Sequence, residues 1–146
     1  MKTFIKPFCF AVLLPGLFFS LPLHARAADK NQVTVEKLLE TENSWDGALY
    51  SPYPTDTPQL SVLKITIPPN SSLDWHEHLV PNAAYVQQGE LTVEKRVSGE
   101  TRTLHAGEVL PEMVNSAHRG YAGKDGVTLI VFYAGQKGID LSRPVN

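Results

Sequence analysis

Cysteine is almost absent from this chain of 146 residues, since the only one is Cys9, near the N-terminus. Cys9 lies in a segment that we expect to be removed, which leaves the remaining protein without a thiol. This absence excludes disulfides, thiolate catalysis and thiolate metal ligands together. The remaining roughly 119 residues must rely on their own hydrophobic core, and a chain of that length buries about two-thirds of its unfolded surface.

The sequence also lacks an apolar run that is long enough to span a membrane. Its longest run, residues 7–21, has about 15 residues and is interrupted by a Pro-Gly pair, whereas a spanning helix needs roughly 20. Lys2 and Lys6 precede the run, and the small-x-small pattern of residues 25–27 follows it. We therefore predict that residues 1–27 are a cleaved signal peptide and that the protein is periplasmic or secreted. A membrane anchor is the alternative interpretation.

Positive charge is scarce in the rest of the chain. The predicted signal takes three of the 13 basic residues and none of the 15 acidic ones, so 10 basic residues remain and the formal charge becomes −5. The pair Lys95-Arg96 is the only basic cluster. This balance argues against a nucleic-acid partner and against an anionic membrane surface once the signal is removed.

No segment shows sustained helical periodicity. Short β-branched segments lie between turn signals instead, among them residues 60–67, which end before Pro68, and residues 127–133, which follow a predicted turn at 123–126. Ser98-Gly99-Glu100 predicts a hairpin turn. About eight closely spaced strands are typical of an all-β fold, a small β-barrel or jelly-roll sandwich.

The N-terminal part of the mature chain has a different composition. Residues 51–58 contain three prolines and predict a loop or an extended linker, and the polar residues before them could form a short helix or strand. We therefore divide the mature chain into an N-terminal arm and linker, residues 28–58, and a β-barrel domain, residues 59–146.

Four histidines lie outside the predicted signal: His76, His78, His105 and His118. On a strand, His76 and His78 face the same way about 6.6 Å apart. They can then share one metal ion at about 2.0–2.1 Å from each ring nitrogen. Neutral imidazole suits zinc, copper, iron and nickel. Taken alone, the pair favours the alternative that these are simply two exposed strand residues.

The wider spacing resembles the two motifs of the cupin superfamily. The first motif is Gly-x5-His-x-His-x3/4-Glu-x6-Gly, and the second is Gly-x5-Pro-x-Gly-x2-His-x3-Asn. His76, His78, Gly89, Gly107 and His118 fall in register with these motifs. The resemblance runs from about residue 61 to residue 133 and implies a cupin-type barrel with a short N-terminal arm.

The chain departs from the motifs at other positions. Asn70 stands for the first glycine, a mild change because asparagine tolerates the left-handed turn conformation. Met113 and Asn115 stand for the proline and glycine of the second motif, and Ala122 for its final asparagine. Asn82 stands where the first motif has its glutamate ligand.

The resemblance implies one divalent metal ion, Fe, Zn, Ni, Mn or Cu, held by His76, His78 and His118. Asn82 is a further candidate ligand through its amide oxygen, and the alternative is that it only hydrogen-bonds a neighbour. A site with three neutral histidines and Asn82 keeps a charge near +2, which favours a small anionic or chelating molecule.

The resemblance leaves the reaction open, because cupins host many functions. One hypothesis is an enzyme of dioxygenase or isomerase type. The alternative is a non-catalytic module of the cell envelope, a sensor or carrier, and a third is a structural dimerising domain. The resemblance also implies a homodimer that buries a hydrophobic sheet face or exchanges the N-terminal arm.

Several other side chains are candidates for parts of the site. Glu112 and Asp74 could each orient a histidine or act as a general base, and the alternative is that both are surface carboxylates. Asn115 could cap a turn or bind a ligand, and Trp45 is predicted to be a packing residue. Four residues are predicted to point away from the site: Trp75, Glu77, His105 and Arg119.

Overall fold

The structure is a computed structural model that describes residues 32–146. The predicted signal, residues 1–27, lies outside the described residues, so its cleavage and the secreted or periplasmic location stay predictions. By its internal contacts the chain divides into residues 1–34 and 35–146, and every strand belongs to the second unit. The described residues include no helix with the length and apolar character to cross a membrane.

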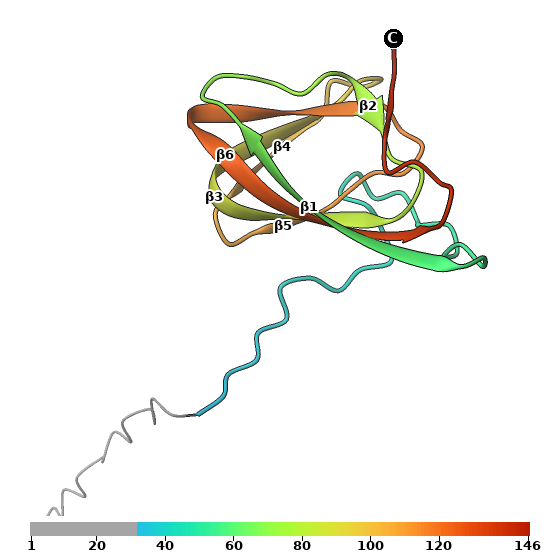
Figure 1. The fold of residues 1–146 in the computed structure, drawn as a ribbon. Coiled ribbons are helices and arrows are strands. Elements are labelled where there is room, and N and C mark those ends of the chain that lie inside the picture. The colour runs from blue at the N-terminus through green and yellow to red at the C-terminus, as the bar shows by residue number, and fades with distance from the viewer. Residues whose placement is uncertain (1–31) are drawn as a thin grey trace, which may run out of the picture. The chain divides into compact units, whose positions relative to one another are not determined.

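Seven β-strands make up the second unit, in agreement with the all-β class predicted from the sequence (Figure 1). In chain order they are β1 (Pro58–Ile67), β2 (His76–Glu77), β3 (Asn82–Lys95), β4 (Thr101–His105), β5 (Val109–Pro111), β6 (His118–Gln136) and β7 (Arg143–Pro144). Their order in the sheet is β4-β3-β6-β2-β7, with β1 also paired to β6 and β5 also paired to β3. Every pairing of these strands is antiparallel.

Strand β6 is the centre of the sheet, because it pairs with β1, β2 and β3. The predicted turn at residues 123–126 was therefore wrong: β6 continues through it as one strand of 19 residues and bends between its two halves (Figure 1). The β3–β6 register shifts between Val86 and Gln88 and again between Gly89 and Leu91, and Gly126 has a φ of 76°. The strand bends at these bulges, at the place where the sequence predicted a turn.

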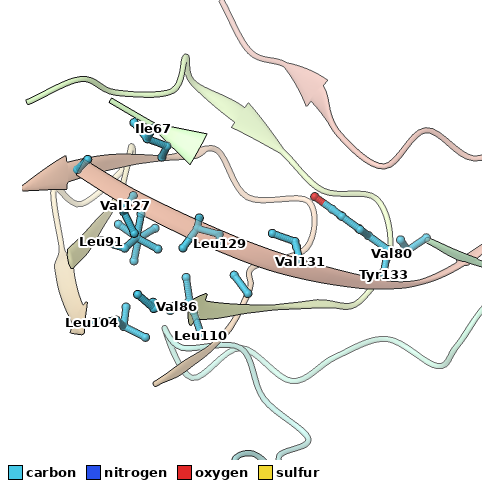
Figure 2. Close-up of a cluster of buried hydrophobic side chains, with 13 residues drawn as sticks. Ile67, Val80, Val86, Leu91, Leu104, Leu110, Val127, Leu129, Val131 and Tyr133 are labelled. Carbon is cyan, nitrogen blue, oxygen red and sulfur yellow. The ribbon is translucent and has the colours of Figure 1, made fainter. Parts of the chain in front are cut away.

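The core lies on the inner face of the strands, where buried and less buried residues alternate along β3 and β6. Figure 2 shows the cluster that these side chains form. It includes Ala84, Val86, Leu91 and Val93 of β3 and Val127, Leu129, Val131 and Tyr133 of β6. The outer face of the β1–β6 pair carries apolar side chains too, with Val62 62% and Phe132 43% exposed. Such a face suits the homodimer expected from the sequence, which stays a prediction.

Part of the predicted N-terminal arm packs on the strands. The backbone N–H of Trp45 donates to the Pro111 carbonyl at 2.9 Å, and its side chain packs against the core, as predicted. The Tyr50 hydroxyl donates to the Glu112 carbonyl at 2.7 Å, and Asp46 pairs with Lys95 at 2.6 Å. The contacts of Trp45 and Tyr50 hold the end of β5 and the residue that follows it, Glu112, which lies at the site.

Candidate metal centre

The fold brings three of the four described histidines together at one end of the sheet. His76 of β2 is the cross-strand neighbour of His118, the first residue of β6, and His78 follows β2 by one residue. One ring nitrogen from each of the three lies within 4.8 Å of the others. His78 and His118 are only 4% and 1% exposed, whereas His76 is partly exposed. The cluster is therefore largely shielded from water and is open on the side of His76.

Backbone carbonyls hold all three imidazole rings by the same nitrogen. The Nδ1 atoms of His76, His78 and His118 lie 2.8, 3.0 and 2.7 Å from the carbonyl oxygens of Asp74, Leu141 and Ser116. A carbonyl oxygen only accepts hydrogen bonds, so each Nδ1 must carry the proton and donate. The three Nε2 atoms are then left with a free lone pair, which is the state a metal ligand requires.

Glu112, one of the two carboxylates considered from the sequence, lies beside this cluster. Its side chain is buried, at 8% exposure for the residue, which rules out the alternative of a surface carboxylate. Its Oε2 lies 3.4 Å from Nε2 of His118, and neither atom has a hydrogen-bond partner among the described residues. Asp74, in contrast, is exposed, and its backbone carbonyl, not its carboxylate, orients His76.

Asn82 begins β3 and is 5% exposed. Its Nδ2 donates to the Val80 carbonyl at 3.1 Å, and its Oδ1 is buried without a hydrogen-bond partner in the described chain. It lines a cavity of about 300 Å³ that also involves Tyr50 and Tyr53. The amide is thus held by its own strand end, and a bond from Oδ1 to a metal stays a prediction.

A second cavity of about 320 Å³ opens onto the histidines. Leu63, Ile65, Leu73, Leu129 and Val131 form its apolar wall. Its polar or ionisable lining side chains are His76, His78, Asp74, Glu112, Tyr133 and Ser142. Trp75 and Pro144 complete the lining, so none of the described residues around the cavity is a lysine or arginine.

The remaining sequence-predicted residues lie outside the histidine cluster. His105 is exposed and lies 3.3 Å from Glu90. Arg119 pairs with Glu94 and stacks over Trp75 at 4.5 Å, and Glu77 pairs with Arg143. Trp75 was predicted to face away from the site, but its ring is half-buried under Arg119 and it lines the cavity. Asn115 adopts a φ of 54°, and its N–H donates to the His78 carbonyl at 2.8 Å.

Sequence reasoning missed two contacts of His78. Leu141, 63 residues further along the chain, supplies the carbonyl that fixes its tautomer. The ring of Tyr133 packs against His78 at a centroid distance of 5.6 Å. A backbone carbonyl leaves no signature in the sequence, whereas Tyr133 was visible as an aromatic residue at the end of a predicted buried strand.

Burial shifts the pKa values of the ionisable groups in opposite directions. It lowers the pKa of His78 to about 3, helped by the neighbouring His118, and that of His118 to about 4. It raises the pKa of Glu112 to about 8. Each shift favours the uncharged form of its group, because a charge loses its hydration in the protein interior.

These shifts predict a stability maximum for the metal-free protein near pH 6.5. Between about pH 4.5 and 6.5 the unfolded chain binds two protons on His78 and His118, while the folded protein binds one on Glu112. The free energy of unfolding should therefore rise with pH there, by about 1.4 kcal/mol per unit. Between about pH 6.5 and 8 only folded Glu112 still holds its extra proton, so stability should fall with a similar slope.

Urea denaturation of the metal-free protein at pH 5.5, 6.5 and 7.5 measures both slopes. Glu112→Gln serves as the control, because it cannot titrate and should lose the decline above pH 6.5. Stability that keeps rising to pH 8 in the unaltered protein would contradict the shift assigned to Glu112.

Comparison with known proteins places this arrangement in a fold class. No protein-family model matches the sequence, and no curated protein matches it. Among solved structures, a cupin-like protein from Thermotoga maritima aligns with a TM-score of 0.52 at 20% identity, over 60% of this chain and 65% of its own. The DMSP lyase DddQ from Ruegeria pomeroyi aligns with a TM-score of 0.53 at 14% identity. The alignment covers 68% of the present chain and 47% of the lyase chain.

A chain from the structures of the DMSP lyases RdDddP and RnDddQII aligns with a TM-score of 0.52 at 23% identity. The alignment covers 44% of that chain and 60% of the present chain. The present chain thus spans less than two-thirds of each of these three proteins. Sequence identities of this size support a shared fold and leave the activity open. Together with the antiparallel sheet and the motif spacing, they show that residues 35–146 have the cupin fold.

Proposed function

We propose that the protein binds one divalent metal ion through Nε2 of His76, His78 and His118 and uses it to bind a small chelating or anionic molecule. The observation that carries this proposal is the common tautomer of the three rings, which leaves each Nε2 with a free lone pair, in a cluster where one ring nitrogen of each histidine lies within 4.8 Å of the others. Histidine ligands in metalloproteins are oriented in this way, by a hydrogen bond from the second ring nitrogen.

The shape and lining of the cavity suggest the kind of ligand. A bound divalent ion would supply Lewis-acid chemistry by polarising a coordinated oxygen. The chain supplies the surroundings: Leu63, Ile65 and Leu129 offer an apolar wall that excludes water, and no lysine or arginine among the described residues lines the cavity. We therefore propose a ligand with one chelating group directed at the histidines and an apolar remainder. That two of the similar structures belong to lyases supports a catalytic role.

Metal analysis of the processed protein tests the proposal. The metal-free protein is reconstituted separately with iron, nickel, zinc, copper and manganese, and the bound metal is counted by elemental analysis. One ion per chain is expected with at least one of these metals. Failure to retain any of the five would contradict the proposed function.

The non-catalytic module stays a second candidate, favoured by Asn82 at the position of the usual carboxylate and Ala122 at that of the last motif residue. A thermal-shift screen of small carboxylic acids, sugars and thiols with the metal-loaded protein finds ligands for either candidate. Product analysis under oxygen then separates them. A ligand that stabilises the protein and is never turned over supports the module.

A further inference from the structure

A carboxylate lies one strand away from Asn82, the residue that stands in this chain for the glutamate of the first motif. Strands β3 and β5 pair with Ala83 opposite Pro111, and the N–H of Glu112 donates to the Asn82 carbonyl at 3.1 Å. Glu112 therefore continues the ladder as the cross-strand neighbour of Asn82. Side chains of such neighbours lie on the same face of the sheet, about 4.5–5.5 Å apart at Cβ. A carboxylate at 112 thus lies on the face that a carboxylate at 82 would occupy, next to His118, although only the ring nitrogens of the three histidines all lie within 4.8 Å of one another.

The separation of Glu112 and His118 matches two ligands of one ion. Their closest atoms, Oε2 and Nε2, lie 3.4 Å apart without a hydrogen bond between them. In a tetrahedral site with bonds of about 2.0–2.2 Å, two ligand atoms lie about 3.3–3.5 Å apart. Each of the two atoms is buried and lacks another partner in the described chain, so an ion between them would satisfy both.

The charge balance points the same way. A carboxylate buried without a cation is costly, and no lysine or arginine among the described residues lines the cavity next to Glu112. A divalent ion would compensate the carboxylate and bring the charge of the site to +1, lower than the +2 expected from three histidines and Asn82. Asn82, which departs from the motif, and Glu112, which would compensate for it, are cross-strand neighbours.

We propose that Glu112 is the fourth protein ligand of the metal and replaces, from the end of β5, the carboxylate that is missing at Asn82. This inference rests on the proposed metal binding by the three histidines. It differs from the motif in the strand that provides the acidic ligand, while the number and the charge of the ligands stay the same.

Zinc affinity, measured by competition with a chromophoric chelator, tests the inference in the folded, processed protein. Glu112→Gln keeps the shape of the side chain and removes its charge, and should weaken Zn²⁺ binding by more than about tenfold, the least that loss of an outer partner costs. The double variant Asn82→Glu/Glu112→Gln returns a carboxylate across the strand pair and should recover much of the loss. Glu100→Gln, at an exposed residue after the β3–β4 turn, is the control and should bind as the unaltered protein does.

The absorption spectrum of the Co²⁺-loaded protein provides a second readout, because it reports the ligand set directly. Glu112→Gln should change this spectrum, and the double variant should move it back. If Glu112→Gln does not fold, Glu112→Asp keeps the charge but shortens the reach by one methylene, and should weaken Zn²⁺ binding as well.

The results separate the two levels of the proposal. If the unaltered protein binds no metal, the three-histidine function is wrong. If it binds Zn²⁺ and Glu112→Gln binds equally tightly with an unchanged Co²⁺ spectrum, the histidine site stands and the role given to Glu112 is overturned.

Discussion

Replacing His118 by alanine is expected to reduce metal affinity by more than about 100-fold. Its Nε2 is buried without a hydrogen-bond partner in the described chain, and its ring lies 4.6 and 5.0 Å from those of His76 and His78. Loss of an outer partner of a ligand already costs about 10–100-fold in affinity, so loss of the ligand itself should exceed the upper end of that range. Equilibrium dialysis against a buffered zinc series measures the effect.

His105→Ala is the matched control, because this histidine is exposed at the end of β4. It should keep the full affinity and one ion per chain. If His105→Ala lost as much affinity as His118→Ala, the metal would be bound by exposed imidazoles instead of the buried cluster, and the assignment of the site would be wrong.

Replacing Gly89 by alanine is expected to be among the most destabilising substitutions of the barrel. Gly89 has a φ of +85°, and a Cβ there would lie 2.0 Å from the backbone oxygen of Gly126. The left-handed conformation costs a residue with a Cβ about 1–2 kcal/mol, and forcing atoms into packed space adds about 1–3 kcal/mol. We therefore expect a loss of about 2–5 kcal/mol in the free energy of unfolding, measured by urea denaturation.

Gly107→Ala separates the two contributions. Gly107 also has a positive φ, +96°, but nothing lies within 4 Å of a Cβ built on it. Only the conformational cost of about 1–2 kcal/mol should remain. Equal losses in the free energy of unfolding at the two glycines would contradict this. They would show that the backbone near Gly126 can shift to accommodate a Cβ at Gly89.

Much of the fold was predictable because the signals that specify it are local or regularly spaced. The strand at residues 60–67 ends at Ile67, before Pro68, as predicted. Gly99 lies between the paired strands β3 and β4, and Asn70 takes the left-handed conformation, with a φ of 54°. The turn at residues 123–126 was mispredicted because glycine-rich composition is typical of both a turn and a bulged corner, and only the pairing partners decide between them.

The site was less predictable than the fold. The proximity of the three rings was predictable from the spacing of His76, His78 and His118, because the two motifs contain the histidines of both β2 and β6. The burial of Glu112 beside the histidines could not be predicted from the motif spacing. It depends on the register between β3 and β5 and on the Tyr50 hydroxyl, which holds the Glu112 carbonyl from a segment predicted to be a separate arm.

The pairing of β2 with β7 has a consequence for the order in which the molecule is assembled. His76 is the cross-strand partner of Pro144, and the His78 ring is held by Leu141, 63 residues later in the chain. Synthesis runs from the N-terminus, so the rings of β2 exist long before the carbonyl that orients His78. Closing a loop of that length must precede completion of the site, and such distant contacts form late in folding. The three-histidine cluster therefore has its final geometry only once the residues around β7 have joined β2.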